Sequence, residues 1–183
     1  MRVIAGKARS LKLRTIEGDS TRPTTDRIKE TLFNMINTYI PGCSFLDLFA
    51  GSGAIGIEAL SRGARKATFV EHNKKCVECI NYNLKFTKLD KEATVINKTV
   101  QFALEELKNG EIYDIIFMDP PYDNMHEKDV LSKLIEYGLV DEDTIIIVEA
   151  SLLTKFDYLD DIGFEVFKNK EYKTNKHVFI RMK

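Results

Sequence analysis

The sequence is poor in cysteine, and no apolar run in it is long enough to span a bilayer. Its three cysteines, Cys43, Cys76 and Cys79, cannot form a complete set of pairs, so we expect free thiols. His72 lies four residues before Cys76, but a structural zinc site usually needs four ligands and no second cysteine pair exists. The first residues lack the apolar core of a secretory signal. We therefore expect a cytoplasmic protein with no metal and no membrane segment.

Acidic residues are missing from the first fourteen positions. Five basic residues occur there: Arg2, Lys7, Arg9, Lys12 and Arg14. Because the net charge of the whole chain is −1, the remainder of the chain is acidic. A basic segment on an acidic body is typical of a protein that binds a polyanion. A strand edge that is protected by charge explains the same pattern, and charge alone does not decide between the two.

Internal repeats and low-complexity segments are also absent, and 183 residues suffice for one domain with a sizeable core. Five short apolar runs occur at residues 44–49, 67–70, 93–96, 113–118 and 144–148. Each is separated from the next by a segment long enough for a helix, which is typical of a parallel sheet covered on both faces. Residues 164–167 and 177–182 flank a polar stretch, 168–176, and we expect them to form an antiparallel hairpin at the sheet edge.

The N-terminal part has its own pattern. Residues 2–14 alternate apolar and basic positions around Gly6, which predicts two short strands and a turn. A helix capped by Thr24 or Thr25 should follow and end before Pro41. We thus expect a single domain over residues 1–183, a doubly wound, Rossmann-like α/β sheet that is mostly parallel with an antiparallel C-terminal strand. Residues 1–20 would be a basic hairpin appendage and 24–183 the catalytic core.

A glycine-rich loop follows the first predicted strand and opens a helix. Gly51, Gly53 and Gly56 match the dinucleotide-binding fingerprint, and Glu71 ends the next strand, where an acid can bind a ribose diol. NAD, FAD and S-adenosylmethionine all fit these glycines. Asp47, four residues before the first glycine, favours a cationic ligand over a pyrophosphate. Since S-adenosylmethionine carries a sulfonium and an ammonium group, it is the cofactor that the loop predicts.

The fourth predicted strand runs directly into Asp119, Pro120, Pro121 and Tyr122. Two prolines fix two φ angles and remove two backbone donors, so the loop is stiff and its carbonyls remain free to accept. The Asp119 carboxylate and the Pro120 carbonyl could each accept one N–H of an arylamine and expose its lone pair for methylation. Tyr122 could stack on an unpaired base. A rigid loop without a catalytic role is the alternative.

These motifs and the N-terminal part together resemble the bacterial small-subunit ribosomal RNA (guanine-N2)-methyltransferase family. The matching stretches are residues 2–7, 22–27, 30–34, 46–64 and 119–122. The glycine loop and Asp-Pro-Pro-Tyr are shared with many amino-methyltransferases. The stretch Arg-Pro-Thr-Thr-Asp-Arg, joined to Glu-Thr-Leu-Phe-Asn, is more specific to this family.

The resemblance implies S-adenosylmethionine as the methyl donor and the exocyclic N2 amine of one guanine in 16S ribosomal RNA as the target. It implies a cofactor site made of Asp47, Phe49, Gly51, Ser52, Gly53 and Glu71. It implies that Asp119, Pro120, Pro121 and Tyr122 hold the base. Related enzymes often place an acid or amide after the third strand to meet the adenine. In this chain Asn97 or Thr99 must serve, unless a backbone group does.

The resemblance also gives the basic segment a role. Its five basic residues would contact RNA phosphates, with Arg22 and Arg27 nearer the site, although helix packing and a local ion pair explain those two equally simply. The expected partner is ribosomal RNA or a small-subunit assembly particle, and we expect a monomer. A DNA adenine or cytosine amino-methyltransferase, a protein amide methyltransferase, an NAD-dependent dehydrogenase and a non-catalytic RNA-binding protein are the alternatives.

Overall fold

A seven-stranded sheet organises the chain, of which the computed structural model describes residues 1–16, 26–121 and 126–183. The strand order is β3-β2-β1-β4-β5-β7-β6; the first five strands are parallel, and β7 pairs antiparallel with both β5 and β6. The strands are β1 (Ser44–Leu48), β2 (Lys66–Val70), β3 (Ala93–Ile96), β4 (Ile115–Met118), β5 (Ile145–Ser151), β6 (Phe164–Glu171) and β7 (Asn175–Met182). The predicted fold class is confirmed.

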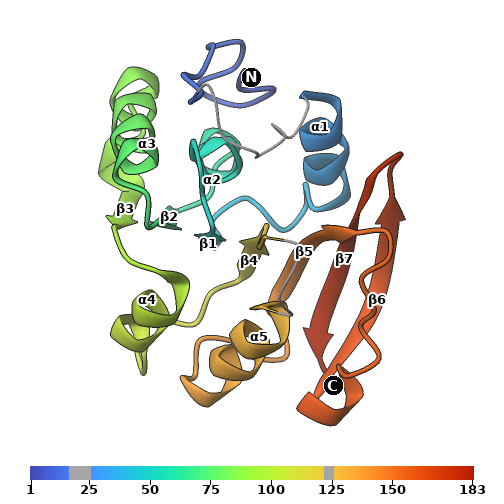
Figure 1. Cartoon of the computed structure of the whole chain (residues 1–183). Helices are drawn as coiled ribbons and strands as arrows, with labels where there is room; N and C mark the ends of the chain where they lie inside the picture. Colours follow the sequence, from blue (N-terminus) through green and yellow to red (C-terminus); the bar gives the residue numbers. More distant parts are fainter. Residues whose placement is uncertain (17–25, 122–125) are drawn as a thin grey trace.

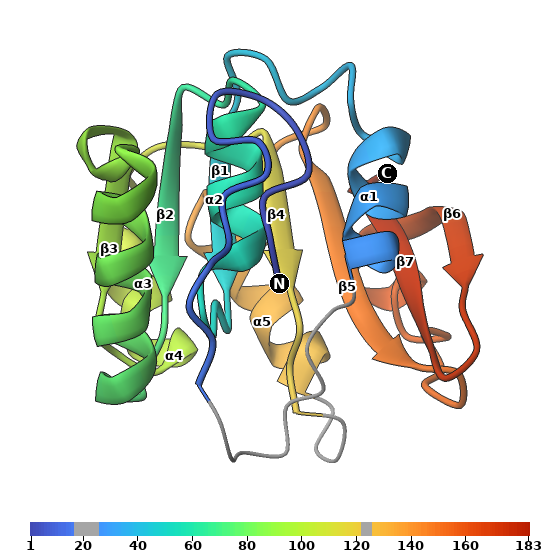
Figure 2. The same cartoon turned by 90° about the horizontal axis from the view of Figure 1, so that it is seen from above.

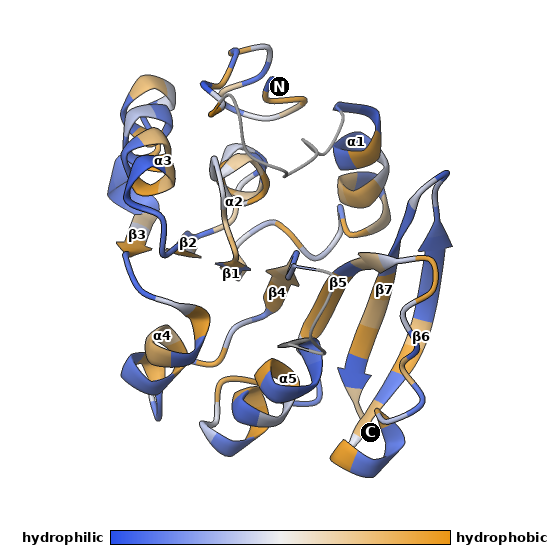
Figure 3. Ribbon diagram, viewed as in Figure 1, coloured by the Kyte–Doolittle hydropathy of each residue, from blue (hydrophilic) through white to orange (hydrophobic). Residues whose placement is uncertain are grey.

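Helices cover both faces of the sheet (Figure 1). They are α1 (Asp26–Met35), α2 (Ala54–Ser61), α3 (Lys74–Thr87), α4 (Val100–Leu107) and α5 (His126–Glu136), with short 3-10 turns at Asp90–Glu92 and Asp160–Ile162. One face carries α1, α2, α3 and the N-terminal segment, and the other carries α4 and α5. Each central strand is therefore buried on both sides, and its side chains alternate between two separate apolar cores. Figure 3 shows the apolar residues of the helices turned toward the sheet.

The C-terminal hairpin is longer than the apolar pattern suggested. The polar stretch 168–176, predicted to be a loop, is mostly strand, because β6 continues to Glu171 and β7 begins at Asn175. β6 lies at the edge of the sheet and its side chains are mostly exposed. Charged side chains at an edge strand discourage pairing with another chain. A polar edge strand has no apolar alternation, so the sequence pattern could not show it.

The N-terminal segment turns back on itself, as expected, but within residues 1–16 the strand pairing is limited to one antiparallel bridge, between Arg2 and Lys12. Its apolar side chains Val3, Ala8 and Leu13 are buried in the same core as α1, α2 and α3. Gly6 makes the close approach possible: it has φ +82°, and a Cβ there would lie 1.8 Å from the Ser61 carbonyl oxygen. The segment crosses α2, as Figure 2 shows.

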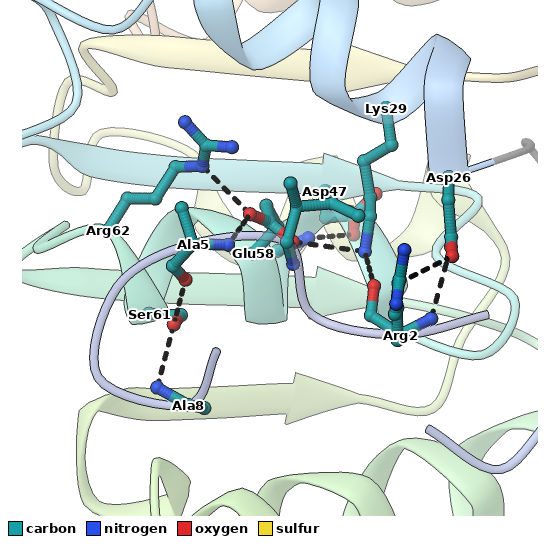
Figure 4. Close-up of polar contacts among 11 residues, drawn as sticks. Arg2, Ala5, Ala8, Asp26, Lys29, Asp47, Glu58, Ser61 and Arg62 are labelled. Carbon is teal, nitrogen blue, oxygen red and sulfur yellow. Dashed lines mark hydrogen bonds and ion pairs between the residues drawn. The ribbon is translucent and has the colours of Figure 1, made fainter. Parts of the chain in front are cut away.

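A buried acid on α2 fastens this segment to the fold (Figure 4). Glu58 is fully buried and accepts from the backbone N–H groups of Ile4 and Ala5, at 2.8 and 3.0 Å. Its carboxylate also pairs with Lys29 Nζ of α1 at 3.0 Å and with Arg62 Nε at 2.8 Å. Lys29 Nζ donates in addition to the Arg2 carbonyl, at 2.6 Å. Four groups thus neutralise or satisfy one carboxylate, which links α1, α2 and the first residues of the chain.

Candidate functional site

The carboxyl ends of β1 and β4 form the topological switch point of the sheet. β1 connects to β2 on one side, whereas its other neighbour is β4, so the chain leaves these two strands in opposite directions. In doubly wound sheets, ligands bind in the crevice at such a point. The glycine loop follows β1 and the Asp119 loop follows β4, and the sheet therefore brings the two sequence motifs to one edge.

The glycine loop is held in place by Glu71, at the end of β2. The two carboxylate oxygens of Glu71 accept from Gly51 N–H at 2.9 Å and from Asn73 N–H at 2.8 Å. Gly51 has φ +55°, and a Cβ there would meet nothing within 4 Å, so its backbone faces open space that a ligand can enter. Gly53, with φ +76°, is the N-cap residue of α2. The loop therefore presents bare backbone at a helix N-terminus.

Asp47 lies beneath this loop, and its side chain is buried. It is 1% exposed, and its Oδ2 accepts from Gly56 N–H at 2.9 Å. Burial, together with the charge of Glu71, raises the pKa of Asp47 to about 7. The Asp47 carboxyl group thus supports the start of α2 from inside the fold through its hydrogen bond to Gly56. Ser52, in the same loop, is half-buried, and its carbonyl accepts from Asn83.

A pocket of about 180 Å³ opens beside the loop, and Phe49, Glu71, His72, Thr99 and Pro121 are among its lining residues. Phe49 has φ +62°, a left-handed conformation that is uncommon for an aromatic residue and is typical of functional sites. Thr99, the N-cap residue of α4, lines the pocket; that it contacts an adenine stays a prediction.

Asn97 behaves differently from Thr99. Its side-chain amide donates to the carbonyls of Glu71 and His72, at 2.9 and 3.0 Å. It therefore ties the end of β3 to the end of β2.

Asp119 lies at the end of β4, on the opposite side of the switch point. Burial, then the charges of Glu149 and Asp47, raises the pKa of Asp119 to about 8. Pro120 is buried and Pro121 is exposed at the pocket rim. Tyr122 lies outside the described residues. Three of the four residues predicted to hold a base are therefore placed beside the glycine loop.

The sequence pattern did not single out a buried polar cluster beside Asp119. It consists of Glu149 on β5, His177 and Asn175 on β7, and Tyr172 in the turn before β7. One sign was available, because Glu149 interrupts an otherwise apolar strand. Its partner His177 is level with it only through the antiparallel register of β5 and β7, which cannot be read from the sequence.

The predicted RNA contacts are all exposed where the structure describes them: Arg2, Lys7, Arg9, Lys12, Arg14 and Arg27. Arg22 lies outside the described residues. Arg2 forms an ion pair with Asp26, at 3.2 Å, and the Arg14 guanidinium lies 5.5 Å from the centre of the exposed Tyr82 ring. Lys7, Arg9 and Lys12 extend from the N-terminal segment, whose backbone donates to Glu58 at Ile4 and Ala5, whereas Arg27 extends from α1. The backbone of residues 1–14 is thus packed against the fold, and its basic side chains point into solvent.

The cysteines have structural surroundings. Cys43 and Cys79 are buried, Cys76 is half-buried, and the Cys79 thiol donates to the Arg14 carbonyl. Within residues 1–16, 26–121 and 126–183, no group of three His, Cys, Asp or Glu side chains is arranged to hold a metal ion. Over the same ranges, no helix has the length and apolar character needed to cross a membrane.

Comparison with known proteins places the whole chain among related sequences. Residues 1–181 match the family described as conserved hypothetical protein 95. The YlbH protein of Bacillus subtilis is 43% identical over 150 residues, which cover 81% of this chain and 82% of that protein. Ribosomal RNA small subunit methyltransferase D of Haemophilus influenzae is 40% identical over 150 residues, covering 81% and 78%. The solved structure of Escherichia coli yhhF is 31% identical, covers 100% of this chain and 98% of that one, and superposes with a TM-score of 0.85.

Proposed function

The chain belongs to the family described as conserved hypothetical protein 95, and from that premise we propose that it methylates the exocyclic N2 amine of a guanine in small-subunit ribosomal RNA. The Haemophilus influenzae relative, which is named as a small-subunit ribosomal RNA methyltransferase, supports this proposal. The observation that carries it is the meeting of Asp119-Pro120 with the glycine loop at the switch point between β1 and β4.

S-adenosylmethionine fits the residues at this edge. Three acidic side chains lie at this edge, Asp47, Glu71 and Asp119, and Lys98 is the one lysine among the residues that line the pocket beside the loop. Such a site suits a ligand with two positive charges and disfavours a pyrophosphate. Glu71 would hold the ribose, the loop at Gly51 the amino acid part, and Thr99 and Phe49 the adenine side of the pocket. When bound, the cofactor supplies an electrophilic methyl group.

The chain's own residues prepare the amine. An arylamine is a weak nucleophile because its lone pair is delocalised into the ring. Asp119 and the Pro120 carbonyl would each accept one N–H of the amine, which favours a tetrahedral nitrogen and frees the lone pair. Because two prolines stiffen this loop, the acceptors would need little reorganisation during the reaction. Tyr122 would stack on the base.

RNA would bind through the exposed basic side chains of residues 1–14 together with Arg22 and Arg27. The charge of these side chains is complementary to that of phosphate groups. Ribosomal RNA, free or in a small-subunit assembly particle, is the partner that we propose, with the protein acting as a monomer in the cytoplasm.

The experiment uses RNA from a strain that lacks this protein. The purified protein is incubated with that RNA, as naked small-subunit RNA and as assembled particles, and with a methyl-labelled donor. Nucleoside digestion should yield labelled N2-methylguanosine from at least one of the two substrates. Label in N6-methyladenosine, or label in DNA but not RNA, would contradict the proposal.

A further inference from the structure

A row of polar side chains crosses three neighbouring strands next to the candidate site. Met118 of β4 is level with Val148 of β5, so Asp119 and Glu149 are the next residues along, and Glu149 is level with His177 of β7. Two residues away from this row, on each of the three strands, lies an apolar side chain of the core under α1 and α2: Phe117, Ile147 and Phe179. Since side chains alternate along a strand, Asp119, Glu149 and His177 face that same side.

Glu149 is buried and fully engaged as a hydrogen-bond acceptor. It is 5% exposed; Asn175 Nδ2 donates to its Oε1 at 2.5 Å, and His177 Nε2 lies 3.2 Å from its Oε2. Each of its two carboxylate oxygens thus has a hydrogen-bond partner on β7. Both donors come from β7, so the antiparallel C-terminal strand holds the Glu149 charge in position.

His177 has a partner on each ring nitrogen. It is fully buried, and its Nδ1 lies 3.1 Å from the Tyr172 hydroxyl. Burial, and then the charge of Glu149, raises the pKa of Tyr172 to about 12. The hydroxyl therefore stays protonated and donates a hydrogen bond to Nδ1. We assign the Nε2–H tautomer to His177 from these partners. The direction of donation is therefore from Tyr172 to His177 and from His177 to Glu149.

Glu149 thus places a fixed negative charge beside Asp119. Two neighbouring carboxylates resist being ionised together. Among the described residues, Asn175 and His177 lie within hydrogen-bond distance of Glu149 and no donor reaches Asp119, so Asp119 is the one that takes up the proton. Within the described residues, Asp47 of β1 and Glu149 of β5 are the charged groups that act on Asp119, and Glu149 has the larger effect of the two. Asp119 is consequently a stronger base than an isolated aspartate.

This basicity matters for the reaction under Proposed function, on which the inference rests. When the amine nitrogen forms its bond to the methyl carbon, the methyl–sulfur bond breaks and its electron pair stays on sulfur. The nitrogen then carries a positive charge and must lose one N–H proton. We propose that Glu149, held by His177 and Asn175, is a positioning residue that makes the Asp119 carboxylate the acceptor of that proton.

The test is Glu149→Gln, which keeps the shape and removes the charge. Without the neighbouring negative charge, ionised Asp119 is more stable, so its pKa falls. The rate of single-turnover methyl transfer, which rises with pH as Asp119 ionises, should reach half its plateau about one pH unit or more lower than in the wild type. Glu127→Gln is the control, because Glu127 is similarly buried, at 7% exposed, on α5, which covers the opposite face of the sheet; its profile should match the wild type.

A second readout needs no activity. The carbon-13 carboxyl resonance of Asp119, identified by its loss in Asp119→Asn, is titrated in the protein without RNA. Its midpoint should fall in Glu149→Gln and not in Glu127→Gln. If Glu149→Gln does not fold, Tyr172→Phe tests the same series of hydrogen bonds from Tyr172 through His177 to Glu149. It weakens the donation to Glu149, so the titration midpoint of Asp119 should move in the same direction by a smaller amount. A midpoint that stays in place in a folded variant overturns the inference, even when the wild-type protein methylates RNA. A midpoint that moves in a protein that methylates no RNA overturns the proposed function instead.

Discussion

At the carboxyl edge of the sheet, the acidic side chains Asp47, Glu71 and Glu149 are buried and their oxygens are occupied by donors. In residues 1–14 the arrangement is reversed: Val3, Ala8 and Leu13 are buried and every basic side chain is exposed. The acids therefore belong to a prearranged site whose electrostatics the fold controls. The bases belong to a solvent-exposed surface, where salt screens their charge.

The backbone of the N-terminal segment depends on the acid Glu58, and breaking this link should have the largest effect. Glu58→Ala leaves Lys29 buried without its carboxylate and two N–H groups, of Ile4 and Ala5, without an acceptor. Removing one partner of a buried pair costs about 3–5 kcal/mol, so the free energy of unfolding in urea should fall by that amount. The matched control is Glu111→Ala, which breaks surface pairs with Arg65 and Lys66 and should cost about 0–1 kcal/mol. Equal losses in the two variants would contradict a special role for Glu58.

The second effect concerns chemistry at the acidic edge. Asp119→Ala removes the carboxylate that would accept from the target amine and should slow single-turnover methyl transfer by about 100- to 1,000-fold. Calorimetry should show donor binding largely unchanged, because the acceptor acts mainly in the transition state. Asp143→Ala, in an exposed turn, is the control and should behave as the wild type. Lost donor binding with an undiminished rate would assign Asp119 to the cofactor instead.

Glu71 should have a smaller effect, and on binding alone. Glu71→Ala removes the acceptor for a ribose diol and for Gly51 N–H, and donor affinity measured by calorimetry should weaken by about 1.5–3 kcal/mol. Glu71→Gln retains one acceptor oxygen and should lose less. Wild-type affinity in Glu71→Ala would remove this residue from the cofactor site.

The smallest effect per residue should come from the exposed bases. Replacing Lys7, Arg9 and Arg14 together by alanine should flatten the slope of log affinity for RNA against log salt by about 0.7–0.9 for each lost phosphate contact. The melting temperature should hardly change, because these side chains extend into solvent. Leu13→Ala, in the same segment, should do the reverse: it opens a cavity in the core and lowers the melting temperature with the salt slope intact. An unchanged slope in the triple variant, with a lower melting temperature, would leave the segment as structural cover alone.

The sequence by itself determined the fold class, the position of the glycine loop and the meeting of Asp47, Gly51 and Asp119 at one edge. Short apolar strands that alternate with helices have few ways to pack, and residues at the ends of parallel strands necessarily share an edge. The same argument placed Glu71, at the end of β2, at that edge, where it lines the pocket beside the glycine loop.

Tertiary structure alone decided which polar groups are partners. Glu58 meets Ile4 and Lys29 because the N-terminal segment folds back across α2, and such contacts between distant parts of the chain leave no periodic trace in the sequence. His177 meets Glu149 because of the antiparallel register of β7, and a shift of one residue would have turned it to the other face. The length of β6 could not be predicted from the sequence for a related reason. This edge strand is hydrogen-bonded to β7 only and needs no alternation of apolar side chains.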